Sequence, residues 1–214
     1  MNASGAARSA HSVSDPHRRI LLEVLEHTLA AVGGRARTRA AAKRLPENAD
    51  WRIFAIGKAA SAMTLGALDV LGPRVSESLV ISKDGHFDTE LAGTMGVRCV
   101  ASSHPVPDER SLAAGRELLH GIARLSANQK VLFLVSGGAS SLVEVLPDGV
   151  TLADLKRVNE WGLAIGIDIL GLNRIRKTLS LIKGGGLLQR LGGFEVYAFL
   201  VSDEASYITG QCIL

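Results

Sequence analysis

Residues 130–142, KVLFLVSGGASSL, decide the expected fold. Five successive apolar residues, Val131 to Val135, predict a strand that is buried on both faces of a parallel sheet. The run stops at Ser136-Gly137-Gly138, and the next residues, beginning with Ala139 and Ser140, can open a helix. Two glycines between a strand and a helix let the backbone approach a ligand, and a helix N-terminus offers N–H groups to an anion. This stretch alone leaves two readings open, a plain turn and an anion-binding loop.

The composition bounds the class of protein. The chain has 214 residues, 47% of them hydrophobic, which is enough for one large α/β domain or two small ones. Aromatic residues make up only 4%, which argues against a surface that stacks bases, so we expect no nucleic-acid partner. Cys99 and Cys212 form neither a metal-ligand spacing nor a disulfide framework, so a reducing cytoplasm is expected. The sequence contains no run of about 18 apolar residues, so no membrane-spanning helix is predicted.

The order of the expected elements predicts the architecture. Residues 1–15, rich in Ala and Ser, predict a disordered tail, and residues 16–214 predict one α/β domain that opens with a helix ending at Gly33-Gly34. Strands are expected at 51–56, 78–81, 97–101, 131–135 and 194–201, and helices at 59–71, 111–125, 151–170 and 173–182. Strands that alternate with helices predict a three-layer, Rossmann-like parallel sheet with flanking helices. The basic stretch 35–44 predicts a solvated helix or connection, with a phosphate contact as the alternative.

Polar residues follow several of the expected strands, and these are Lys58, His86, His104, Asp108, Ser136 and Asp203. The carboxyl ends of the strands in an open parallel sheet face one crevice, which is where ligands bind. A lysine and a glycine loop at that edge suit phosphate. Simpler readings stay open for single residues. His104 can only shape the turn before Pro105, and Asp203 can close its strand through an Asx turn rather than accept a proton or hold Mg²⁺.

A basic segment lies between residues 172 and 183. It carries Arg174, Arg176 and Lys177, with Lys183 one step beyond the expected helix. Arg176 and Lys183 are seven residues apart, which on a helix would place them on the same side, where they could grip a carboxylate or phosphate. A solvated basic face is the alternative.

Two familiar nucleotide-binding loops are excluded by their spacing. The Walker A loop needs a glycine five residues before Gly57, where Arg52 stands. The run Gly184-Gly185-Gly186 fails the dinucleotide fingerprint because Gln189 occupies the place of its third glycine. A nucleotide would therefore have to bind through another arrangement.

Six motifs occur in a fixed order along the chain: IGKAASAM at 56–63, SKDGH at 82–86, HPVPDE at 104–109, VSGGASSL at 135–142, LNRIRKTLSLIKGGGL at 172–187 and VSD at 201–203. Together they resemble the class II glycerate kinases, the glycerate 2-kinase family whose C-terminal half is called the MOFRL domain. The resemblance covers about residues 18–203.

The resemblance implies transfer of a phosphoryl group from ATP, assisted by Mg²⁺, to a hydroxyl of D-glycerate. It implies that Lys58 neutralises the transferred phosphoryl group and that Asp203 orients or deprotonates the hydroxyl, with Asp203 also the one candidate to contact Mg²⁺. The residues that would bind substrate or phosphate are Ser136, Gly137, Gly138, Ala139, Ser140, His104, Asp108, Asn173, Arg176, Lys177 and Lys183.

The chain departs from the family pattern in places. Ser103 and Gly186 stand where the family often has glycine and arginine, and Glu204 to Gly210 replace a usual V-P-G-D-D continuation. Because family enzymes are much longer, the chain is expected to be an N-terminal domain whose C-terminal domain is missing, with little or no kinase activity alone. A homodimer or a separate chain could supply the rest.

Three other hypotheses remain. The chain could be a non-catalytic binding or regulatory domain for phosphosugars or sugar acids, because a strand followed by Ser-Gly-Gly and a helix would serve that role too. It could be a decayed fragment that folds poorly. The hydroxypyruvate reductase label of some relatives gains no support from the failed dinucleotide fingerprint.

Overall fold

The protein is described from a computed structural model, which covers residues 16–200 apart from the side chains of residues 29–32, 163 and 169. The chain divides into two units, residues 1–33 and residues 34–214. In the first unit, helix α1 (Pro16–Val32) begins at a proline and ends before Gly33, where the helix was expected to end. The tail predicted for residues 1–15 lies outside the described residues. None of the helices described is long and apolar enough to cross a membrane.

The second unit is built on one sheet whose described strands all run parallel. Its strand order is β3-β2-β1-β4-β5. The strands are β1 (Asp50–Ile56), β2 (Val75–Lys83), β3 (Val97–Ser102), β4 (Gln129–Val135) and β5 (Val196–Leu200). The apolar run Val131 to Val135 forms most of β4 and is buried, because β4 has a strand on each side and helices over both faces. The predicted parallel α/β sheet is confirmed.

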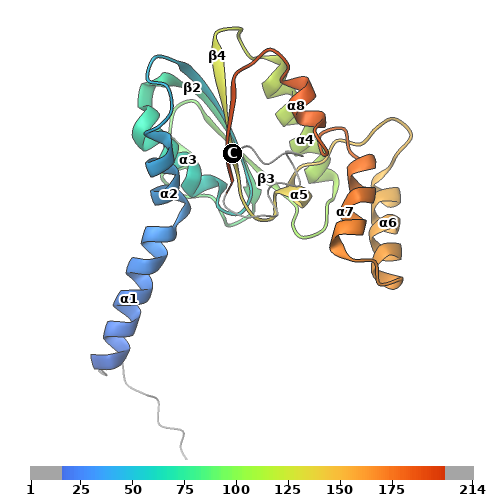
Figure 1. The fold of residues 1–214 in the computed structure, drawn as a ribbon, viewed down its shortest axis with the longest axis horizontal. Coiled ribbons are helices and arrows are strands. Elements are labelled where there is room, and N and C mark those ends of the chain that lie inside the picture. Colours follow the sequence, from blue (N-terminus) through green and yellow to red (C-terminus); the bar gives the residue numbers. More distant parts are fainter. Residues whose placement is uncertain (1–15, 201–214) are drawn as a thin grey trace, which may run out of the picture. The chain divides into compact units, whose positions relative to one another are not determined.

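Helices cover both faces of this sheet, as Figure 1 shows. In β1, Ile53 and Ala55 pack on the side of α2 (Gly34–Ala42) and α3 (Ala60–Leu71), whereas Phe54 and Ile56 pack on the opposite side. This alternation follows from the two-residue period of a strand. The opposite face is covered by α4 (Glu109–Ala123), α5 (Ala139–Leu142) and α8 (Gly186–Arg190). The result is the expected three layers.

Helix boundaries after residue 150 differ from the prediction. Helix α6 (Leu152–Ala164) stops six residues before the predicted end at Leu170, since Gly166 takes a positive φ of 70°. Helix α7 (Ile169–Thr178) then begins earlier and ends earlier than predicted. The prediction of one helix to Leu170 and another to Ile182 is therefore wrong. Two short 3₁₀ turns, Gly72–Arg74 and Leu91–Gly93, complete the described elements.

The strand order creates a switch point at the centre of the sheet. The chain leaves β1 for β2 and β3 on one side and then crosses to β4 on the other side. Since β1 and β4 are neighbours in the sheet, the loops that follow them leave in opposite directions. Open α/β sheets bind ligands at such a point. This position holds the GKA and SGG sequences.

Candidate functional site

The loops after β1 and β4 are joined directly to each other. The backbone N–H of Lys58 donates to the carbonyl oxygen of Gly137 at 3.0 Å, and the N–H of Ala59 donates to Ser136 Oγ, also at 3.0 Å. Gly57, with φ 131°, makes this contact possible, because a Cβ at that position would clash with Ser136 Oγ and lie 2.6 Å from the Ser136 carbonyl oxygen. The buried Ser136 side chain thus joins the two loops through a hydrogen bond.

The SGG loop turns sharply into α5. Gly138 is left-handed, with φ 87°, and precedes the first residue of that helix. A Cβ on Gly138 would lie 2.7 Å from His104 Cδ2, so the glycine lets the imidazole rest against the loop backbone. Helix α5 has only four residues. The expected helix N-terminus is thus a single turn with little macrodipole, and any anion held there depends on individual N–H groups and nearby cations.

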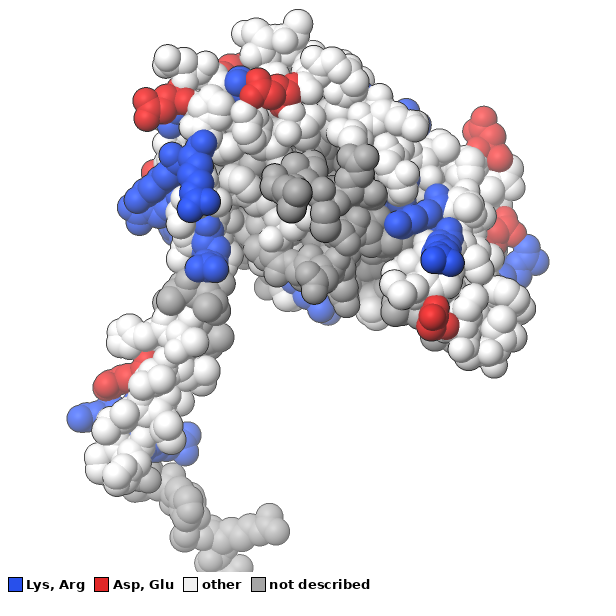
Figure 2. Space-filling view, in the orientation of Figure 1, with Lys and Arg blue, Asp and Glu red and all other residues white. Residues whose placement is uncertain are grey.

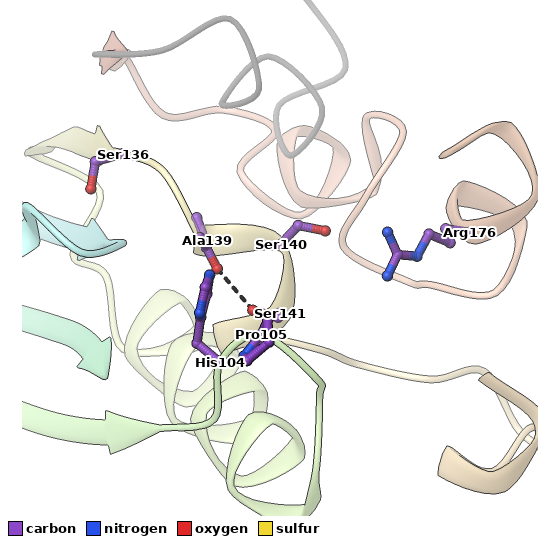
Figure 3. Close-up of a pocket in the computed structure, with 8 residues that line it drawn as sticks. His104, Pro105, Ser136, Ala139, Ser140, Ser141 and Arg176 are labelled. Carbon is purple, nitrogen blue, oxygen red and sulfur yellow. Dashed lines mark hydrogen bonds between the residues drawn. The ribbon is translucent and has the colours of Figure 1, made fainter. Parts of the chain in front are cut away.

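A cavity of about 140 Å³ opens beside this loop. It is lined by His104, Pro105, Ser136, Gly138, Ala139, Ser140, Ser141 and Arg176. Figure 3 shows the Arg176 side chain reaching from α7 toward Ser140, with His104 and Ser141 on the other side of the loop turn. Within residues 16–200 the guanidinium of Arg176 has no ion-pair partner, and no carboxylate lines the cavity. The cavity is therefore suited to an anion.

Positive charge near His104 comes from the ends of two strands, β1 and β2. Burial lowers the pKa of His104, and the charges of Lys58, Lys83 and His86 lower it further. Lys83 ends β2 and is paired in register with Ser102 of β3, two residues before His104. Lys83, unlike Lys58, was not predicted as a site residue, although both lie at the carboxyl ends of buried strands. Figure 2 shows further Lys and Arg side chains over α2 and α7.

Asp108 has a structural role as the N-cap of helix α4. Its side chain caps α4 by accepting the N–H of Arg110, and Ser111 completes the capping box. Arg110 also pairs with Asp108 and with Asp84 at 3.0–3.1 Å. Asp108 does not line the cavity. The structure brings together His104, the SGGAS loop and Arg176, and it leaves Asp108 outside that group.

Lys183 does not project beside Arg176 from one helix, as the seven-residue spacing predicted, since α7 ends at Thr178. The Lys183 side chain is only 3% exposed and forms an ion pair with the equally buried Glu144. Asn173 and Lys177 lie on α7 but are not among the residues that line the cavity.

Asp203 lies outside the described residues, as does the rest of the VSD motif. Over residues 16–200 no group of three or more His, Cys, Asp or Glu side chains could hold a metal ion. Two carboxylates in the loops after β2 and β3, Asp84 and Asp108, are engaged by Arg110. These residues do not by themselves fit a magnesium site.

Comparison with known proteins identifies the family. A family model described as "Domain of unknown function (DUF4147)" matches residues 13–206, nearly the whole chain. The chain belongs to the DUF4147 family. This DUF4147 chain is 34% identical over 188 residues to the D-glycerate 2-kinase of Thermotoga maritima, covering 87% of the chain and 44% of the relative.

A solved structure shares the fold of the chain, and a further sequence relative carries a different name. The crystal structure of a glycerate kinase from Thermotoga maritima superposes on the DUF4147 chain with a TM-score of 0.80 at 30% identity, covering 91% of this chain and 47% of that one. A protein of Agrobacterium vitis, provisionally named a hydroxypyruvate reductase, is 38% identical over 152 residues, covering 71% and 38%. The DUF4147 chain thus spans less than half the length of these relatives. The resemblance to the N-terminal part of the glycerate 2-kinases is confirmed.

Proposed function

We propose that this protein binds D-glycerate in the cavity beside Arg176 and takes part in transfer of a phosphoryl group from ATP to a hydroxyl of that acid. The observation that carries the proposal is the cavity itself: a small space at the switch point of the sheet, whose lining among the described residues contains an arginine and no carboxylate. The names of the glycerate 2-kinase relatives support the choice of acid.

The size of the cavity favours a small acid. Sites for drug-sized ligands usually occupy about 300–1,000 Å³, whereas this cavity measures about 140 Å³. A three-carbon hydroxy acid fits such a space and a whole nucleotide does not. We propose that only the transferred phosphoryl group of ATP enters the cavity.

Each residue of the proposed site has a role that its chemistry suits, although Lys58 and Gly137 are not among the residues that line the cavity. Arg176 would bind the carboxylate of the acid, because a guanidinium donates two parallel hydrogen bonds to a carboxylate. Lys58 would neutralise charge on the transferred phosphoryl group, and catalysis of phosphoryl transfer is mostly positioning and electrostatics. Residues 136–140 would hold an anionic oxygen, and His104 would hydrogen-bond the acid.

The roles of the remaining predicted residues stay proposals. Asn173 and Lys177 would extend the binding surface along α7. Asp203 would orient the acceptor hydroxyl and contact the Mg²⁺ that accompanies ATP. A role for Asp108 in binding is weaker than its role as a helix cap. Residues from a second copy or another chain would complete the site.

Binding of a phosphosugar without catalysis is the second candidate. The same loop, lysine and arginine would bind a phosphate ester, and the absence of a metal-ligand cluster among residues 16–200 is compatible with it. Hydride transfer by a hydroxypyruvate reductase is less favoured, since the sequence lacks the dinucleotide fingerprint.

Calorimetry on the purified protein tests the proposal. D-glycerate and ATP should both bind, and Arg176→Ala should raise the Kd for D-glycerate at least tenfold, since it removes a charged pair worth more than about 1.4 kcal/mol. Arg174→Ala is the matched control, because Arg174 is an exposed arginine of the same helix that does not line the cavity. Affinity for a phosphosugar without affinity for ATP or D-glycerate would favour the second candidate.

An assay of ADP release with D-glycerate and Mg-ATP then tests turnover. We expect the chain alone to show low turnover, and Lys58→Ala to abolish whatever turnover is present. Consumption of NADH with hydroxypyruvate, in place of ADP release, would reverse the assignment.

A further inference from the structure

Arg176 reaches the cavity from a helical hairpin that lies to one side of the sheet. Helices α6 and α7 pack mainly on each other, and Figure 1 shows them together beside the three-layer body. Two segments join this hairpin to the body, residues 143–151 before α6 and residues 179–185 after α7. The position of Arg176 over the SGGAS loop therefore depends on how these two segments are fixed.

The two segments are fixed to each other at one place. The N–H of Leu181 donates to the carbonyl oxygen of Val145 at 2.8 Å, and next to it the ammonium of Lys183 pairs with the carboxylate of Glu144. Both charged side chains are nearly inaccessible, at 3% and 1% exposure. Glu144 also accepts the N–H of Val145 at 3.1 Å through its other oxygen. Each carboxylate oxygen thus has a partner.

Glu144 is itself anchored to the body. Its N–H donates to the carbonyl oxygen of Ser111 on α4 at 3.0 Å. Gly115, one turn further along α4, packs so closely that a Cβ there would clash with the carbonyl oxygen of Glu144. On the other side of the pair, Ile182 is buried in the core that α4 shares with the sheet. A continuous series of contacts therefore runs from α4 through Glu144 and Lys183 to the end of α7.

Stability alone does not require charges at this place. Burying an ammonium and a carboxylate costs desolvation that their attraction only partly returns, and an apolar pair of similar size is often as stable. The pKa of Lys183 is lowered by burial in the first place, and the nearby positive charge of Arg176 lowers it further while Glu144 opposes both effects. Glu144 thus compensates the charge of Lys183 and leaves Arg176 as the cation that faces the cavity.

We propose that Glu144 is a positioning residue, which holds Lys183 at the base of the α6–α7 hairpin so that Arg176 is kept over the ligand cavity. The ligand part of this proposal rests on the proposed binding of D-glycerate by Arg176. The mechanical part does not, because it concerns only where the hairpin is held.

Removing both charges together separates position from stability. In Glu144→Leu/Lys183→Met no buried charge is left unpaired, so the melting temperature should stay within a few degrees of the wild type. We expect amide hydrogen exchange to rise at least tenfold in Ile169–Thr178 and to stay unchanged in β4, and the Kd for D-glycerate to rise at least tenfold. Arg98→Met/Glu117→Leu, which removes an exposed pair outside the cavity lining, is the matched control and should change neither quantity.

A swapped pair covers the case in which the apolar variant folds poorly. Glu144→Lys/Lys183→Glu retains an ion pair but places a carboxylate close to Arg176. That carboxylate should draw the guanidinium away from the cavity and weaken D-glycerate binding in a folded protein.

The outcomes are distinct. Unchanged exchange in α7 in a folded Glu144→Leu/Lys183→Met variant would overturn the proposal, and so would faster exchange in that variant with wild-type affinity for D-glycerate. If the wild type does not bind D-glycerate while α7 exchange rises in the variants, the proposed function fails and the positioning of the hairpin by Glu144 is supported.

Discussion

At the scale of single residues, His104 responds to charges at the ends of two strands, β1 and β2. Its ring rests against Gly138, and the positive charges of Lys58, Lys83 and His86 act on it from β1 and β2. Burial and these charges all favour the neutral imidazole, so the folded protein releases the proton of His104 more readily than the unfolded chain does. The stability that this provides is present above the unfolded pKa of about 6.5 and is lost as the pH falls through the lower folded value.

Replacing Lys83 tests this electrostatic coupling. In Lys83→Ala the pKa of His104 should rise toward its ordinary value, because one of the repelling charges is gone. Inorganic phosphate added to the wild type should raise the pKa as well. Both shifts can be followed by NMR titration of the imidazole resonances. Lys43→Ala, on the segment after α2, should leave the titration unchanged, and an equal shift in that variant would contradict the local origin of the effect.

At the scale of elements, the caps and ends of helices explain what the sequence could and could not predict. The strands were predicted because short apolar runs such as Val131 to Val135, which contain β-branched and aromatic residues and end at glycines, favour a buried strand over a helix. The end of α6 was misplaced because apolar residues continue past Ala164, at Ile165, Ile167 and Leu170. Only the turn at Gly166 separates the two helices, and one glycine is a weak signal.

The same limit applies to the site. Lys58, His104 and the SGGAS loop could be found because parallel strands bring their carboxyl ends to one edge. The pairing of Lys183 with Glu144 could not, since the two residues are 39 positions apart and meet only through the packing of α4 against the core. Sequence spacing within an assumed helix gave Lys183 the wrong surroundings.

Asp108 provides a test at this scale, because capping and ligand binding make different demands on it. Asp108→Ala removes the acceptor for the N–H of Arg110 and should lower the free energy of unfolding by about 1 kcal/mol. Asp108→Asn keeps a capping oxygen and should remain close to the wild type in urea unfolding. If Asp108→Asn retains stability but loses affinity for D-glycerate, the carboxylate binds ligand after all.

At the scale of the whole molecule, the sheet is covered on both faces by two apolar clusters. Residues of β1, β2 and β4 contribute to both clusters, so the three inner strands hold the three layers together. Such a core predicts one cooperative unfolding transition for residues 34–200, whereas a fragment that folds poorly would show no such transition.

Leu132→Ala measures the strength of this core. Leu132 is fully buried in β4, and its truncation should lower the free energy of unfolding by about 2–5 kcal/mol. Met95→Ala is the control, because Met95 is 97% exposed and should change stability by less than about 0.5 kcal/mol. Urea unfolding followed by circular dichroism and by the fluorescence of buried Trp51 should give coincident curves. Separate curves would show that the core is not one cooperative unit.

The pairing of β1 with β4 has a consequence for the timing of synthesis. Asp50 and Gln129, which lie opposite each other at the start of these strands, are 79 residues apart. At translation rates of about 5–20 residues per second, the GKA loop leaves the ribosome roughly 4–16 s before the SGG loop that completes it. During that interval β1 can pair only with β2. Ligand cannot assist the first half of the domain to fold, because its binding place does not exist until the second half has been made.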